Sequence, residues 1–190
     1  MTNSSKQHTI SANTGNLFSI GLMLIIMPVM ILLFGMIWKF NTQGLTERSL
    51  SNLKYVLIIF IAGVIIHELI HGMTAAWYAG LGWKNIRFGV QWKSFTPYCH
   101  STLPMSASKY RYVVVMPLII LGIIPYIIAL INGSGWFLTT GILFTVTAAG
   151  DMIILWMMRK LKGPELVQDH PTEIGFLIID QSEEIRPATI

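Results

Sequence analysis

Two histidines and a glutamate fall within five consecutive positions of the chain, as His67-Glu68-Leu69-Ile70-His71. If this segment is a helix, residues four apart lie on the same face, about 6 Å from each other. Two imidazoles at that spacing can bind one zinc ion, and the glutamate between them can reach a water on the metal. The pattern therefore predicts His67 and His71 as zinc ligands and Glu68 as the general base of a hydrolytic reaction.

A structural role is the alternative, because histidines on helices often do no more than hydrogen-bond. Glu68, however, lies in the middle of an apolar segment, where an unpaired charge costs at least about 2.5 kcal/mol in a membrane. A metal ion with its water supplies the partner that this charge requires. Within a metal site the alternative function is a non-catalytic metal-binding membrane scaffold or transporter component, which would need the histidines but not Glu68.

A third metal ligand must come from another segment, because catalytic zinc usually takes three protein ligands and leaves one position for water. Asp151 is the leading candidate. It is the only ionisable residue in its apolar segment, and it lies at a depth similar to that of the two histidines. Gly150 and the two alanines before it should let the helices approach closely. A plain hydrogen bond to a neighbouring helix is the competing role for Asp151.

Two other histidines are rival third ligands. His100 lies in a polar loop, and His170 lies in the C-terminal tail beside Asp169. If either one completes the site, a loop or the tail must fold over the apolar segments.

Four apolar stretches must position these residues, and each is about long enough to cross a hydrocarbon core of roughly 30 Å. They run from about residue 17 to 38, 55 to 78, 112 to 131 and 136 to 158. The composition agrees, since 53% of the 190 residues are hydrophobic and only 12% are charged, too few to cover a soluble protein. We therefore predict one all-α integral membrane domain over residues 1–190, a bundle of four transmembrane helices.

Basic residues indicate how the bundle is oriented. The loop between the second and third spans and the segment after the fourth span are basic, whereas the turn at Asn132–Gly135 has no charge. The positive-inside rule therefore predicts a multi-pass protein of the cell membrane with both termini, and the tail 159–190, in the cytoplasm. No basic stripe with interleaved aromatic residues stands apart from the spans, so nucleic acid is not an expected partner.

The stretch between the second and third spans, Gly82–Leu103, is too polar to cross a membrane. Apolar residues alternate from Ile86 to Trp92, which predicts a short strand or hairpin whose edge could pair with an extended peptide. The single cysteine, Cys99, allows neither an intrachain disulfide nor a cysteine-rich zinc site.

Taken in order, these motifs resemble the "Putative zincin peptidase" family of small bacterial membrane proteins, whose layout is similar to that of site-2 proteases. The segments that carry the likeness are HELIHG at 67–72, Pro97–His100, Tyr110–Tyr112 leading into Met116-Pro117, Ala149–Asp151 and Asp169–Pro171. The resemblance implies two histidine ligands, a catalytic glutamate, an aspartate ligand from the later helix, and peptidase activity. The chain departs from site-2 proteases in keeping only Gly150-Asp151 of their Asn-Pro-Asp-Gly signature.

The predicted function is thus zinc-dependent hydrolysis of peptide bonds in or at the membrane, with Glu68 activating a zinc-bound water. The expected partners are Zn²⁺, the lipid bilayer and a peptide or membrane-protein substrate. The identity of that substrate and the oligomeric state do not follow from the sequence.

Overall fold

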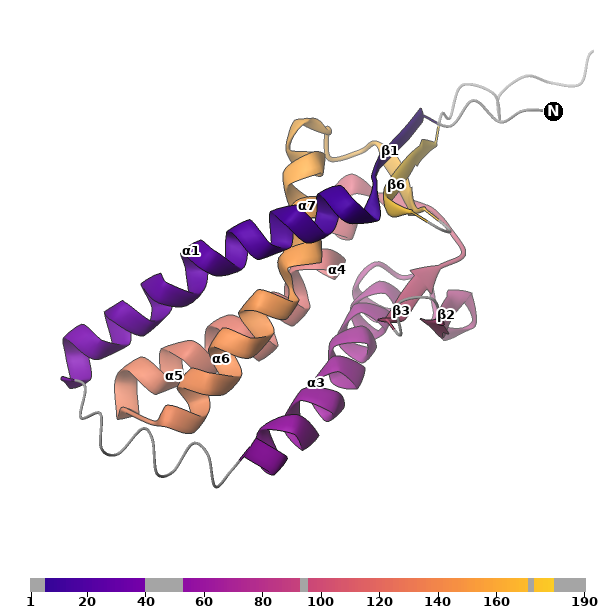
Figure 1. Cartoon of the computed structure of the whole chain (residues 1–190). Coiled ribbons are helices and arrows are strands. Elements are labelled where there is room, and N and C mark those ends of the chain that lie inside the picture. Colours follow the sequence, from indigo (N-terminus) through magenta and orange to yellow (C-terminus); the bar gives the residue numbers. More distant parts are fainter. Residues whose placement is uncertain (1–5, 40–52, 93–95, 171–172, 180–190) are drawn as a thin grey trace, which may run out of the picture.

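The computed structural model describes residues 6–39, 53–92, 96–170 and 173–179. Most of these residues are helical, as predicted, and the long helices run lengthwise through the molecule (Figure 1). Within these described ranges three helices are long and apolar enough to cross a membrane, over Asn13–Trp38, Tyr55–Tyr78 and Ala107–Asn132. The fourth predicted span is a pair of helices, Gly135–Thr147 and Ala149–Lys160, bent by 45°.

The helical segments are more broken than four straight spans would be. In chain order they are α1 (Ala12–Trp38), α3 (Leu53–Met73), η1 (Thr74–Tyr78), η2 (Trp83–Asn85), α4 (Ala107–Pro117), η3 (Leu118–Ile123), α5 (Ile124–Asn132), α6 (Gly135–Thr147), α7 (Ala149–Met157) and η4 (Met158–Lys160). The third span contains Pro117 and Pro125, each of which lacks the N–H that an α-helix needs. A π-helical segment, η3, lies between the two prolines and absorbs the mismatch.

The third span begins at Ala107, five residues before the predicted start at Tyr112. The predicted start was too late because Lys109 and Arg111 were counted among the basic residues of the loop between the second and third spans. Both residues lie in the first turns of α4 and are paired with backbone carbonyls. The Lys109 ammonium donates to the carbonyl of Ala79 at 3.0 Å, and the Arg111 guanidinium donates to the carbonyls of Met158 and Leu161. These bonds cap the ends of two other helical segments and hold them against α4.

Two antiparallel sheets correct the all-α prediction. The predicted hairpin between the second and third spans is present as β2 (Ile86–Gln91) paired with β3 (Thr96–Ser101). A four-stranded sheet, which the sequence did not predict, has the order β1-β6-β5-β4. Its strands are β1 (Lys6–Ile10), β4 (Met105–Ser106), β5 (Leu166–Asp169) and β6 (Ile174–Ile179). The C-terminal tail therefore folds back and pairs with the first described strand.

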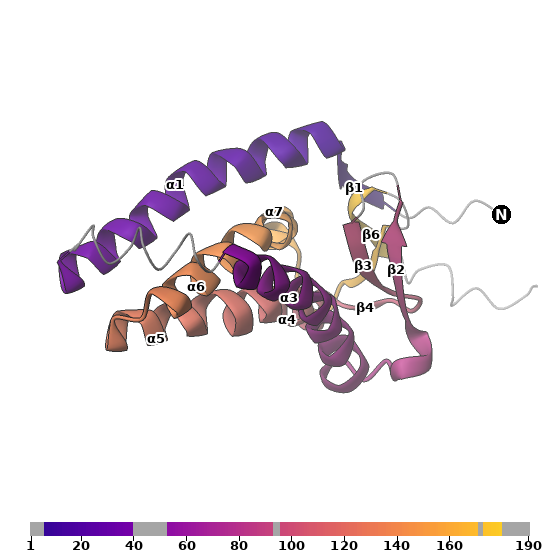
Figure 2. The same ribbon diagram turned by 60° about the horizontal axis from the view of Figure 1, so that its bottom comes forward.

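Both sheets lie at the same end of the helices (Figures 1 and 2). Because β1 pairs with β6, residues 6–10 and 174–179 are on the same side of the apolar segments. At the opposite end, the Trp38 indole N–H donates to the carbonyl of Leu130 at 3.1 Å. This arrangement matches the predicted alternation of the spans, while their orientation relative to the cytoplasm stays a prediction.

The buried core that supports the candidate site lies where α4, α7 and the four-stranded sheet meet. Tyr110, Met158, Val167 and Phe176 are buried there with 0 to 2% of their surface exposed. A second buried cluster fastens α1 to α5 and α6, and in it the Tyr126 hydroxyl donates to the carbonyl of Met30. The first cluster fixes the tail strands to the start of α4, beside the residues described next.

Candidate metal centre

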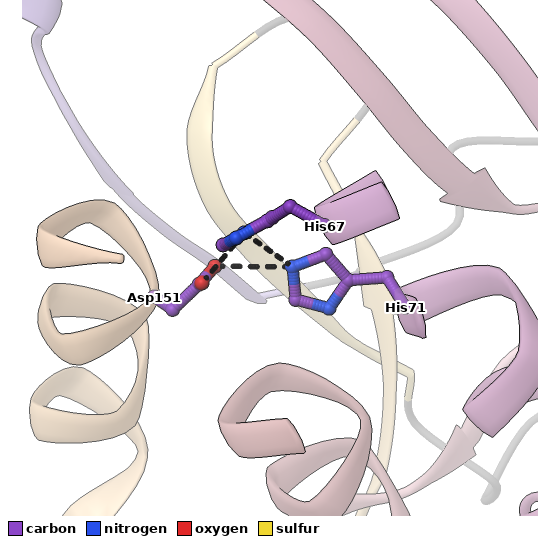
Figure 3. Close-up of side chains that lie close together, drawn as sticks. All are labelled: His67, His71 and Asp151. Carbon is purple, nitrogen blue, oxygen red and sulfur yellow. Dashed lines mark hydrogen bonds and ion pairs between the residues drawn. The ribbon is translucent and has the colours of Figure 1, made fainter. Parts of the chain in front are cut away.

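The HExxH segment occupies the second half of α3, and its two histidines lie one turn apart as the spacing predicts. Their ring centroids are 4.9 Å apart, and the rings meet edge to face. The two Nε2 atoms are 3.2 Å apart and point toward a common centre (Figure 3). Both side chains are largely shielded from solvent, since His67 is buried and the His71 side chain is 13% exposed.

Asp151 reaches this centre from the first turn of α7, directly after the bend that separates α6 from α7. One carboxylate oxygen, Oδ2, is 3.1 Å from His67 Nε2, and the other, Oδ1, is 3.4 Å from His71 Nε2 (Figure 3). A carboxylate in the first turn of a helix is also stabilised by the positive end of the helix dipole. The bend therefore places Asp151 both at a helix N-terminus and opposite the two histidines.

The reason given for the close approach at Asp151 was partly wrong. A Cβ added at Gly150 would meet nothing within 4 Å, so this glycine does not make room for a neighbouring helix. Ala148 and Ala149 are buried, and they are the small residues that pack. α4 contacts both α3 and α7, so this helix sets the separation across which the histidines and the aspartate meet.

The spacing of the three side chains fits a divalent metal ion. Ligands at about 2.0–2.1 Å from a tetrahedral zinc lie about 3.3–3.4 Å from one another. The two Nε2 atoms are 3.2 Å apart, and they lie 3.1 and 3.4 Å from different oxygens of the Asp151 carboxylate, so the three side chains are close enough together to bind one ion. The carboxylate oxygen that faces His67, Oδ2, is buried and has no N–H or O–H donor among the described residues, which leaves it available to a cation.

The hydrogen bond of His71 fixes the imidazole tautomer that metal binding needs. Its Nδ1 lies 2.8 Å from the carbonyl oxygen of Val113, on α4. A carbonyl can only accept, so Nδ1 carries the proton and Nε2 of the neutral ring offers a lone pair to the centre. A histidine ligand held by a backbone carbonyl is typical of metal sites, because the second bond orients the ring.

Glu68 lies one position along the helix from His67, so its side chain points about 100° away from the ligand face. On that side α3 is covered by the β2–β3 hairpin. The backbone N–H of Cys99, on β3, faces the Glu68 carboxylate. Strand β3 thus lies against the Glu68 carboxylate, beside His67 and His71. The sequence predicted a short strand or hairpin in this region but not this contact.

Gly72 allows the hairpin to lie this close to α3. It shares a helix face with Glu68, four residues before it. A Cβ added at Gly72 would lie 2.4 Å from Phe88 Cζ and 3.3 Å from Cys99 Sγ, which is tighter than ordinary packing. The sequence carries a signal for this contact, because a glycine inside an apolar helix usually has a packing reason.

The two rival histidines lie outside the cluster. Within the described residues the only group of three that could hold a metal ion is His67, His71 and Asp151. His100 faces Asp169, with Nδ1 3.8 Å from Oδ2, and His170 Nδ1 accepts a hydrogen bond from the Glu173 N–H.

Burial and the nearby carboxylates of Glu68 and Asp169 together raise the pKa of the Cys99 thiol to about 12. At neutral pH the thiol is therefore protonated, and a protonated thiol is a poor metal ligand and a poor nucleophile. Cys99 contributes its backbone N–H, which faces the Glu68 carboxylate, and not its thiol.

Comparison with known proteins agrees with this geometry. A protein of Pyrococcus woesei, named "Uncharacterized 24.7 kDa protein in gap 5'region", is 27% identical over 129 residues, which are 66% of this chain and 56% of that protein. The chain thus spans little more than half the length of this relative. No solved structure matches the chain. The profile of the family described as "Putative zincin peptidase" matches residues 60–163, more than half of the 190, and includes the HExxH segment and Asp151. The chain therefore belongs to the "Putative zincin peptidase" family.

Proposed function

We propose that this protein hydrolyses peptide bonds in or at a membrane, with zinc held by His67, His71 and Asp151 and with Glu68 as general base. The observation that carries the proposal is the convergence of two Nε2 atoms and one carboxylate, 3.1 to 3.4 Å apart, beside a glutamate on the same helix. Membership in a family described as zincin peptidases supports the same chemistry.

The three side chains suit the metal in charge as well as in spacing. Two neutral imidazoles and one carboxylate leave a net charge of about +1 on a bound divalent ion. A zinc ion held by these three residues would make a bound water more acidic and would polarise the substrate carbonyl.

Glu68 would carry the proton in this reaction. Its carboxylate takes a proton from the attacking water while the water oxygen bonds to the peptide carbonyl carbon. The same carboxyl group then gives that proton to the amide nitrogen as the carbon–nitrogen bond breaks, so Glu68 ends the cycle ionised. The β2–β3 hairpin, which packs against α3 on this side, keeps the side chain in one position between the two transfers.

The site lies within helices that are apolar enough to cross a membrane, but near one end of them. Seven residues separate His71 from Tyr78, the last residue of that span, which is about 10 Å of helix. This depth suits substrates that enter the membrane from the end where the sheets lie.

The Glu68→Gln variant tests the proposal. We would measure zinc per chain by elemental analysis, and hydrolysis with fluorescent casein and with a labelled transmembrane peptide in detergent. Glu68→Gln should keep its zinc and lose about 10²–10⁴-fold in rate, whereas Glu173→Gln, at an exposed carboxylate of the tail, should match the wild type. Bound zinc without hydrolysis in the wild type would favour the non-catalytic scaffold instead.

Asp151→Asn tests the third ligand separately. The amide keeps the shape of the side chain but contributes less to a divalent cation than a carboxylate does, so the variant should bind zinc more weakly. If His100→Ala or His170→Ala emptied the site and Asp151→Asn did not, the third ligand would come from outside the helices.

A further inference from the structure

Strand β3 turns one edge toward β2 and the other toward the candidate metal centre. The edge turned away from β2 presents the backbone N–H groups of Cys99 and Ser101, because alternate residues of an antiparallel strand point the same way. Each of the two N–H groups meets a carboxylate. The Cys99 N–H faces Glu68, and the Ser101 N–H donates to Asp169 Oδ2 at 3.0 Å.

Asp169 is itself held firmly. Its second oxygen, Oδ1, accepts a 2.5 Å hydrogen bond from the hydroxyl of Tyr110, which is buried on α4. The Ser101 hydroxyl adds a third bond to the carboxylate at 3.2 Å. Asp169 ends strand β5, which is paired on both edges and anchored by the buried Val167. The carboxylate is thus a fixed point supplied by the C-terminal tail.

Gln168, the residue before Asp169, also links β5 to the end of β3. Gln168 Nε2 donates to the carbonyls of Ser101 and Thr102. His100 does not compete for the carboxylate, because its 3.8 Å separation from Asp169 is too long for a hydrogen bond. The end of β3 is therefore held by β5 and by Tyr110, and not by the hairpin alone.

We infer that Asp169 is a positioning residue for the proposed hydrolysis: by holding the Ser101 amide and hydroxyl it fixes the edge of β3, so that the Cys99 N–H stays on the Glu68 carboxylate. The inference rests on the proposed function. Cys99 and Ser101 are two residues apart on one strand, about 6.8 Å, so a shift at Ser101 moves Cys99 as well. Asp169 lies outside the residues that the family profile matches.

The experiment compares Asp169→Ala and Asp169→Asn with the wild type and with Glu173→Gln as the matched control. For each protein we would measure zinc per chain, kcat and KM on fluorescent casein, and hydrogen exchange of the amides in residues 96–101. Asp169→Ala should keep its zinc and its KM and lose about tenfold or more in kcat, as expected when a residue that orients a catalytic group is removed. The Cys99 and Ser101 amides should exchange faster. Asp169→Asn, which still offers an oxygen to Ser101, should recover part of the rate.

Three results separate the possibilities. A kcat for Asp169→Ala within about twofold of the wild type would overturn the inference. A parallel loss of zinc, KM and kcat would also overturn it, because that pattern marks general disruption of the fold. If Asp169→Ala does not fold, kcat and KM of Asp169→Asn are compared with those of the wild type, and an unchanged kcat overturns the inference. A wild type that binds zinc but cleaves nothing would instead refute the proposed function, and the exchange of the 96–101 amides would still show whether Asp169 fixes β3.

Discussion

Replacing Gly72 with alanine should separate the placement of Glu68 from the binding of zinc. The added Cβ would lie 2.4 Å from Phe88 Cζ, and carbon atoms in contact are about 3.5–4.0 Å apart, so the ring must retreat by about 1.1–1.6 Å. Phe88 belongs to β2 and Cys99 Sγ on β3 lies 3.3 Å from the same Cβ, so the hairpin retreats together with the ring, and because Phe88 is 47% exposed the cost in free energy should be near 1 kcal/mol. Alanine stabilises a helix by about 1 kcal/mol relative to glycine, which offsets this cost.

Stability should therefore change little in Gly72→Ala, while the hairpin shifts away from α3. A misplacement of about 1 Å in a catalytic arrangement can cost on the order of 100-fold in rate. We expect kcat to fall by about 10- to 100-fold, because the Cys99 N–H moves with the hairpin. Zinc content should not change, because the three proposed ligands are held by α3, α4 and α7.

Gly150→Ala is the matched control, since it makes the same substitution one residue from Asp151. A Cβ there meets nothing within 4 Å, so this variant should keep both zinc and activity and gain a little stability. Thermal unfolding in detergent, zinc analysis and the casein assay would be applied to both proteins. Full activity in Gly72→Ala, or loss of zinc together with activity, would show that the hairpin does not position Glu68.

Three further predictions follow from the fold. The purified protein should carry about one zinc per chain, and His67→Ala and His71→Ala should each remove it; equal metal content in all three proteins would rule out the site. Reporter fusions after Lys162 should report the cytoplasm, and fusions at Ser134 the opposite side, with the reverse pattern overturning the orientation alone. The Cys99 thiol should resist maleimide at pH 8, because its pKa of about 12 keeps it protonated, and its labelling rate should rise with pH through 9 and 10. If the folded protein is labelled at pH 8 as fast as the protein unfolded in SDS, the Cys99 thiol is not buried.

The grouping of His67, His71 and Asp151 could be predicted from the sequence because its signals are local. The spacing of His67 and His71 depends only on helix periodicity, and the depth of Asp151 depends only on counting residues along two apolar segments. The structure brings these three residues together, although α4, not Gly150, sets the separation of the helices. The hairpin could also be predicted, because alternation of apolar residues is visible within one short segment.

The four-stranded sheet was not predicted, because two of its three pairings are distant in the chain. β1 pairs with β6 across more than 160 residues, and β4 pairs with β5 across about 60, so only the β5–β6 pairing is local. Asp169 appeared only as part of a family likeness, since its role depends on Ser101 and Tyr110, which the sheet brings to it. The Lys109 and Arg111 charges were misinterpreted for the same reason, because their carbonyl partners lie 30 to 50 residues away.

The distribution of polar groups along α3 indicates from which end water would reach the site. From Val56 to Ile66 this helix has no polar side chain, so the polar groups of its apolar part are gathered at the end that lies toward the sheets. Toward the sheets, the Glu68 carboxylate is followed by the edge of β3 and then by Asp169, whose side chain is 24% exposed. Hydrolysis consumes a water molecule, and water in a hydrocarbon layer must be bound by polar groups. The hairpin and the tail therefore place polar groups between Glu68 and the partly exposed Asp169, and this is the side from which we expect water to reach the site.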